Sequence, residues 1–196
     1  MDINRTEQLV FGLTCVNYTM RCLLLSSVFI LYPALMSAEN AFPPTAPGVA
    51  EVKTLPAGVL LKSTGQGSYF DESNGLFRPL FRYISSRDIA MTTPVEISIE
   101  NAAMFFWVAP SEVAKVNGDA DGVKVIRMAE RQVASRGERG GYSQANFEKT
   151  RDELLAWLLV QPEIMAAGEP YAVYWNGPFT PWFLKRYEVH VPVHPR

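Results

Sequence analysis

Residues 74–97, NGLFRPLFRYISSRDIAMTTPVEI, decide the fold class, because they predict a helix that runs directly into a strand. Leu76, Leu80 and Ile84 recur at positions i, i+4 and i+8, and Phe77 and Phe81 lie beside them. This spacing places the apolar side chains on one wide stripe of a helix of about three turns. We therefore expect a helix that packs this stripe against a sheet.

Apolar and polar residues alternate in the second part of the stretch. The apolar residues Val95, Ile97 and Ile99 alternate with Glu96, Ser98 and Glu100. A period of two predicts a strand with one buried face, and we expect the glutamates on its other face to point into water. Pro94 fits the first position of such a strand, because it has no N–H to donate to a neighbouring strand.

The rest of the chain repeats this order of elements. The patterns predict strands at residues 51–53, 59–64, 104–108, 123–133, 171–175 and 186–193, a second helix at residues 143–160, and loops at residues 110–122, 136–141 and 176–181. Strands, a helix and two strands are thus followed by the same series again. Two similar halves predict a pseudo-symmetric α+β domain, and the short connections favour antiparallel pairing.

The beginning of the chain has the pattern of a secretory signal peptide. An apolar run from Leu23 to Leu35 follows Arg21 and ends in small residues around Ala38. The run is shorter than the ~20 residues that a membrane span needs. We expect residues 1–38 to be removed on export to the periplasm or the medium, with either Met1 or Met20 as the start. A retained N-terminal membrane anchor is the alternative.

Residues 39–48, ENAFPPTAPG, predict a proline-rich tether without a core-forming pattern, and residues 49–194 predict the folded domain. Both cysteines, Cys15 and Cys22, precede this domain, which excludes disulfides and cysteine metal sites from it. The whole chain carries 18 Lys and Arg residues against 20 Asp and Glu residues. This balance gives no reason to expect a nucleic-acid partner, and we expect a monomer.

Two motifs resemble the SOUL (haem-binding protein) family. The first is F-x-x-L-F-x-Y-I at residues 77–84, followed by M-T-x-P-V at residues 91–95. The second is PYAVYWNGPFTPWFLKRYEVHVPV at residues 170–193, although Tyr187 stands where the family's R-R-N-E-V motif has Asn. The resemblance covers residues 49–193. It implies a distorted antiparallel β-barrel flanked by two α-helices, an architecture that also resembles bacterial effector-binding domains.

The resemblance also implies a function and a site. In SOUL relatives porphyrin contacts are proposed on the first helix, which corresponds here to Phe77, Phe81 and Arg82, with Leu80 alongside. Two aromatic rings could stack on the macrocycle while Arg82 pairs with a propionate. The implied function is reversible, non-covalent binding of haem or another tetrapyrrole without a strong protein ligand to the iron. In the simpler alternative, Phe77 and Phe81 belong to the core and Arg82 is a surface charge.

The histidines argue against iron ligation and against catalysis. The chain has only His190 and His194. In the last strand Tyr187, Val189 and Val191 share one face, so His190 lies on the other face, and we expect it to be solvated or salt-linked. No histidine is placed to act as a base for a serine nucleophile, and no phosphate-binding motif is present. We therefore expect a binding protein rather than an enzyme, with no metal site.

Two other functions stay open. An effector-binding module would hold a small amphipathic cation with Glu96 or Glu188 as the buried charge, whereas an arginine-lined groove would favour porphyrin carboxylates. A module without a ligand would use its tryptophans either as core or as a partner-facing patch. These are Trp107, Trp157, Trp175 and Trp182.

Overall fold

The computed structural model describes residues 38–196, so the predicted signal peptide and both cysteines lie outside the described residues. The helices are α2 (Tyr69–Ser85), η1 (Pro110–Lys115), α3 (Gln144–Leu159) and η2 (Trp182–Leu184), where η marks a 3₁₀ helix. The strands are β1 (Ala50–Leu55), β2 (Gly58–Thr64), β3 (Val95–Ser98), β4 (Ala103–Val108), β5 (Val123–Met128), β6 (Arg131–Arg139), β7 (Ile164–Ala166), β8 (Tyr171–Tyr174) and β9 (Arg186–Pro195).

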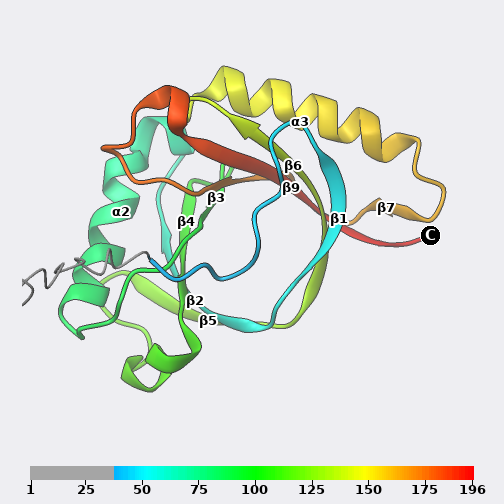
Figure 1. Ribbon diagram of the computed structural model, residues 1–196. Coiled ribbons are helices and arrows are strands. Elements are labelled where there is room, and N and C mark those ends of the chain that lie inside the picture. Colours follow the sequence, from blue (N-terminus) through cyan, green and yellow to red (C-terminus); the bar gives the residue numbers. More distant parts are fainter. Residues whose placement is uncertain (1–37) are drawn as a thin grey trace, which may run out of the picture. The chain divides into compact units, whose positions relative to one another are not determined.

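The strands form one curved antiparallel sheet, which confirms the predicted α+β class. Its order is β1-β6-β9-β8-β3-β4-β2-β5, and β7 pairs with the end of β9. Figure 1 looks onto the concave side of this sheet, and the strands curve around it. β1 and β5 end the order and are not paired with each other. The predicted barrel is therefore not strictly closed.

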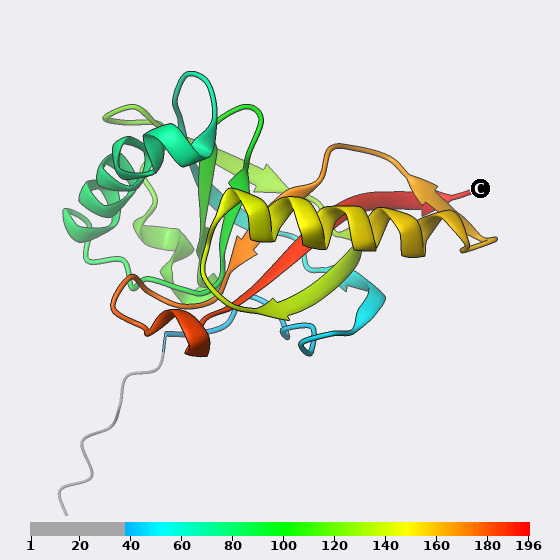
Figure 2. The same cartoon turned by 90° about the horizontal axis from the view of Figure 1, so that it is seen from above.

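The two predicted halves are present. The series β1-β2-α2-β3-β4 is followed by β5-β6-α3-β8-β9, and β7 is an addition to the second half. α2 packs on β2, β4 and β5, whereas α3 packs on β6, β7 and β9. Figure 2 shows that the two helices lie on different parts of the outer face of the sheet.

Both α-helices begin at a serine that caps the first turn. The side chain of Ser143 accepts a hydrogen bond from the N–H of Asn146, as expected for the second helix. Ser68 accepts one from the N–H of Phe70, so α2 begins earlier and runs longer than the periodicity indicated. One face of α2 is buried as predicted, with Leu76 and Leu80 almost completely covered.

Both faces of the sheet are buried, which contradicts the expectation for its polar positions. On β2, Leu61 belongs to the core under the helices and Leu60 belongs to a second core on the concave side. Glu96, Glu188 and His190 also lie on that concave side, each at most 5% exposed. The alternation of the strands was predicted correctly, but the prediction that these side chains face water was wrong, because the concave side is covered.

The cover is the segment that the sequence indicated to be a tether. Phe42 and Thr45 are buried, and the blue segment crosses the concave side of the sheet in Figure 1. Gly137 makes this packing possible, because a Cβ atom there would lie 2.4 Å from the carbonyl oxygen of Thr45. The loop predicted at residues 136–141 is instead largely the end of β6, where glycine allows the close approach.

Candidate binding site

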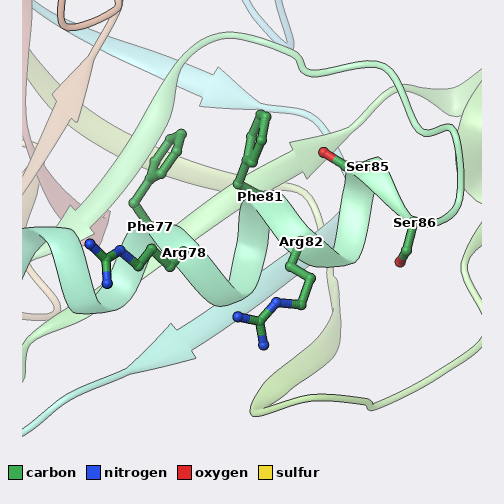
Figure 3. A pocket seen from close by; sticks show the side chains of 6 residues that line it. All are labelled: Phe77, Arg78, Phe81, Arg82, Ser85 and Ser86. Atoms are coloured by element: carbon green, nitrogen blue, oxygen red, sulfur yellow. The ribbon is translucent and has the colours of Figure 1, made fainter.

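The outer surface of α2 carries a pair of stacked aromatic rings. The ring centroids of Phe77 and Phe81 are 5.6 Å apart and the planes differ by 16°. Phe77 also contacts the buried ring of Phe106 edge-on at 5.6 Å, so the core holds it in place. Phe81 is 50% exposed. The pair is therefore a fixed aromatic surface with one side open to solvent (Figure 3).

Two arginines flank this aromatic pair. Arg78 and Arg82 line the same groove of about 580 Å³ as Phe77 and Phe81. In Figure 3 the two rings project from one side of the helix and both guanidinium groups project from the other side in this view. Among the side chains that the structure describes, no carboxylate forms an ion pair with either arginine. The groove thus combines apolar area with two available positive charges.

The structure brings three of the four residues suggested by the sequence together. Phe77, Phe81 and Arg82 line one groove, whereas Leu80 points into the core and is fully buried. Leu80 can therefore support the helix but cannot touch a ligand in this groove. Sequence reasoning missed Arg78, although its i, i+4 spacing from Arg82 places both charges on one side of the helix.

A second groove of about 410 Å³ adjoins the first at Phe77, which lines both. The rings of Tyr142 and Tyr174 lie parallel in it with 3.9 Å between centroids, and Lys185 Nζ lies 4.8 Å from the centroid of Tyr142. The hydroxyl of Tyr174 is buried without a hydrogen-bond partner among the described residues, and burial raises its pKa. A ligand atom that accepts a hydrogen bond would satisfy this group. A tyrosine-rich strand was the only sign of this groove in the sequence.

The concave side of the sheet holds a buried carboxylate that is fully hydrogen-bonded. Glu188 accepts bonds from Lys53 Nζ at 2.6 Å and from Trp175 Nε1 at 2.7 Å. The backbone N–H of Thr45 and the hydroxyl of Ser135 donate at 2.8 and 2.9 Å. Burial alone would raise the pKa of Glu188, but the hydrogen bond from His190, followed by the Lys53 ammonium, lowers it to about 2. Glu188 is therefore ionised at neutral pH.

His190 is part of the same cluster. Its Nε2 lies 2.7 Å from the Glu188 carboxylate and its Nδ1 lies 3.2 Å from the hydroxyl of Tyr171. Burial lowers the pKa of His190 to about 4, against the opposing effect of Glu188. The neutral ring thus donates from Nε2 and accepts at Nδ1. The sequence predicted a solvated or salt-linked histidine; the side chain is instead buried, and at neutral pH its contact with the carboxylate is a hydrogen bond from a neutral ring.

A second buried carboxylate has the same kinds of partner. Glu96 accepts from Trp107 Nε1 at 2.9 Å and from Arg131 Nη2 at 2.9 and 3.0 Å. Burial raises the pKa of Glu96 even though Arg131 and Trp107 act to lower it. Each buried glutamate therefore has one indole and one basic side chain as partners.

Phe42 fills the space between these two clusters. Its ring meets Trp107 edge-on at 5.7 Å and Trp175 edge-on at 5.5 Å. Lys53 Nζ lies 5.2 Å from the centre of the same ring. Residues 39–48 were predicted to be a tether outside the folded domain, but Phe42 belongs to the core. A single aromatic residue in a proline-rich segment has no periodic pattern that could reveal this.

No group of three or more His, Cys, Asp or Glu side chains within residues 38–196 could hold a metal ion. In the same range, no helix has the length and apolar character to cross a membrane.

Comparisons with known proteins agree with this fold. The C-terminal domain of EcmrR is 13% identical, with 74% of this chain and 97% of that chain covered and a TM-score of 0.58. The EcmrR–DNA complex in EcmrR-RPo is 12% identical over 74% of this chain, with a TM-score of 0.60, and this chain covers only 57% of that one. A hydrolase from Listeria innocua is 14% identical, with coverages of 81% and 94% and a TM-score of 0.49. At these identities the likeness to EcmrR shows a shared fold alone.

Sequence comparison is more specific. No curated protein sequence matches the chain. The family profile described as SOUL heme-binding protein matches residues 44–192, which is most of the chain and includes both grooves and both carboxylate clusters. This chain belongs to the SOUL heme-binding protein family.

Proposed function

We propose that this protein binds haem or a related tetrapyrrole reversibly in the groove on α2. The observation that carries the proposal is the half-exposed pair Phe77 and Phe81 beside Arg78 and Arg82. A flat macrocycle can lie against the aromatic surface, where dispersion and loss of apolar area from water favour contact. The two guanidinium groups match the two propionate carboxylates of haem, because each can form short charge-assisted hydrogen bonds.

The neighbouring groove supports a ligand that extends past Phe77. Lys185 supplies a third cation there, and the unpartnered Tyr174 hydroxyl supplies a donor. The two grooves have volumes of about 580 and 410 Å³, both within the ~300–1,000 Å³ range of small-molecule sites. A tetrapyrrole that lies against Phe77 could therefore contact both grooves.

Affinity without a strong iron ligand follows from the positions of the histidines. His190 is buried on the concave side and both its nitrogens already have partners. His194 is exposed near the end of β9, and its Nδ1 contacts the Pro195 carbonyl. Contact area and carboxylate pairing would then supply the affinity, and we propose that the protein binds its ligand without catalysing a reaction on it.

A second candidate, binding of an amphipathic cation, is favoured by the two buried glutamates and their tryptophan partners. Glu96 and Glu188 have the burial that such a site needs. However, Arg131 and Lys53 already neutralise them, and Phe42 occupies the aromatic space between them. A cation would have to displace groups of the protein itself, so the α2 groove is the better-supported site.

Hemin titration of the wild type and of Arg82→Glu tests the site. A charge-assisted contact contributes about 1.5–3 kcal/mol, so the affinity should fall at least about tenfold. Lys149→Glu, an exposed reversal on the other helix, is the matched control and should leave the affinity unchanged. Hemin dimethyl ester, which lacks the carboxylates, should bind weakly. Its affinity should be the same for Arg82→Glu and for Lys149→Glu. Identical titration curves for Arg82→Glu and wild type would show that hemin does not bind in the α2 groove.

Two further ligands separate the rival functions. Iron-free protoporphyrin should bind about as tightly as hemin if the protein supplies no iron ligand. A cationic dye should bind only weakly, and Arg82→Glu should not weaken it. Strong dye binding that is lost in Glu188→Gln, with no response to hemin, would favour the cation module instead.

We also propose that the domain acts outside the cytoplasm. The apolar run from Leu23 to Leu35 behind Arg21 supports export, with cleavage before Glu39. N-terminal sequencing of protein from its native host tests this. An intact Met1 or Met20 on a cytosolic protein would contradict export, whereas the same terminus in the membrane fraction would favour the retained anchor.

A further inference from the structure

The loop between β8 and β9 exposes several large apolar side chains to solvent. Residues 177–184, the aromatic loop, carry Phe179 at 98% exposure, Trp182 at 70%, Phe183 at 57% and Leu184 at 51%. In both views this orange-to-red loop lies at the margin of the domain rather than between elements (Figures 1 and 2). Such a cluster of large exposed apolar side chains marks an interaction surface.

Hydrogen bonds hold the aromatic loop in this shape. The N–H of Thr180 bonds to the carbonyl of Gly177 at 3.2 Å, and the N–H of Leu184 bonds to Pro181 at 2.9 Å. At its base, the N–H of Arg186 bonds to the side-chain oxygen of Asn176 at 2.7 Å. The apolar side chains are therefore presented by a built turn, so little further ordering is needed when they are covered.

Basic residues surround the base of the loop. Lys185 and Arg186 follow it directly, and Arg139 on β6 lies opposite Arg186 in the antiparallel ladder. Like charges directly opposite each other on neighbouring strands are unfavourable. Neither arginine has an ion pair with a carboxylate in the part of the chain that the structure describes, and the nearby Glu138 is already paired with Arg136. An anionic partner would relieve this repulsion.

We propose that the aromatic loop inserts into the interfacial region of a membrane that contains anionic lipids. Trp and Phe side chains favour the boundary between headgroups and acyl chains, and the loop presents them beyond its basic base. Arg139, Lys185 and Arg186 then meet the anionic headgroups, where each cation contributes to binding. This charge pattern favours a lipid surface over an apolar groove of another protein, which would leave the cross-strand arginines unpaired. The inference does not depend on tetrapyrrole binding.

A local probe tests insertion. Because the apolar run before residue 38 is common to all variants, total vesicle binding would not isolate the loop. We would measure quenching of tryptophan emission by brominated acyl chains in phosphatidylcholine vesicles with and without phosphatidylserine. Insertion predicts quenching that increases with phosphatidylserine and decreases with salt. In a Trp157→Phe background, which removes the partly buried indole of α3, Trp182→Phe should abolish the quenched component, since the remaining Trp107 and Trp175 are buried.

Matched variants complete the test. Arg139→Gln and Arg186→Gln should each raise the lipid concentration at half-maximal quenching about fivefold. Phe179→Ala should raise it at least about tenfold. Leu159→Ala, an exposed apolar residue on α3, should leave it unchanged. Quenching that survives Trp182→Phe, or an absence of quenching, would overturn the proposal. So would a Phe179→Ala protein that loses self-association in solution while vesicle quenching is unaltered, since the loop would then be a protein interface.

Discussion

Replacing His190 with glutamine should flatten the dependence of folding stability on pH. The pKa of this histidine is lowered from its ordinary value of 6.5 to about 4 by burial. Below pH 6.5 the unfolded chain takes up a proton that the folded protein does not accept until the pH approaches 4. The free energy of unfolding of the wild type therefore falls as the pH falls through this range. At ~1.4 kcal/mol for each pH unit, the full loss is roughly 3 kcal/mol.

Two buried carboxylates also change their protonation on unfolding. The pH dependence of the wild type's free energy of unfolding therefore cannot be assigned to His190 alone. The pKa of Glu188 is lowered from 4.5 to about 2, so its contribution is lost mainly below pH 4.5. The pKa of Glu96 is raised, so the folded state takes up that proton first and gains stability as the pH falls. These two effects have opposite signs, and only a difference between variants isolates His190.

Urea unfolding followed by tryptophan fluorescence provides the measurement, at several values from about pH 7 down to about pH 4.5. Over this range the stability difference between wild type and His190→Gln should change by roughly 2–3 kcal/mol. The stability difference near pH 7 measures the hydrogen bonds that are lost with the ring. The change of this difference with pH measures the proton that His190 takes up on unfolding. His194→Gln is the control, because that side chain is exposed. A constant difference between wild type and His190→Gln at all pH values would refute the reasoning.

Four other outcomes are expected. Phe42→Ala should lower the free energy of unfolding by about 3–5 kcal/mol in a denaturant titration, because a buried ring is removed from between two tryptophans. Phe179→Ala, by contrast, should change it by less than about 0.5 kcal/mol. Glu96→Ala should cost roughly 3 kcal/mol, since it leaves a buried guanidinium without its carboxylate, and the exposed Glu100→Ala is its control. His190→Gln should change hemin affinity by less than about tenfold in a Soret titration, because its ring nitrogens already have partners; a lost Soret shift would place the iron on the concave side.

Periodicity predicted both α-helices and most strands with their faces, but it gave residues 123–133 as one strand where the structure has β5 and β6, and it did not indicate β7. The helix stripe of Leu76 and Leu80 is buried, and the side chains of β9 divide between two faces as the alternation indicates. What lies against each face is a tertiary property. Leu60 and Leu61 are both apolar and both buried, and nothing in the local pattern shows that one lies under a helix and the other beside Phe42. For this reason the local pattern placed Glu96 in water, and a buried glutamate entered only through the effector-binding alternative.

The candidate site was predictable where it lies on one element. Phe77, Phe81 and Arg82 fall on a single helix, so spacing along the chain places them together. Tyr142, Tyr174 and Lys185 come from separate segments, and only the folded sheet brings them to the second groove. Leu80 shows the limit even within a helix, because a residue next to the site in sequence points to the core instead.

Phe42 also changes where the domain begins. The family match starts at residue 44, two positions after this ring. A chain cut at that boundary would keep every strand from β1 to β9 and yet lack the ring that separates Trp107 from Trp175. We therefore expect the smallest unit with a complete core to start before Phe42, earlier than the matched region. A processing cut behind Ala38 would leave Glu39, Asn40 and Ala41 ahead of the ring, and trimming by four more residues would remove a piece of the core.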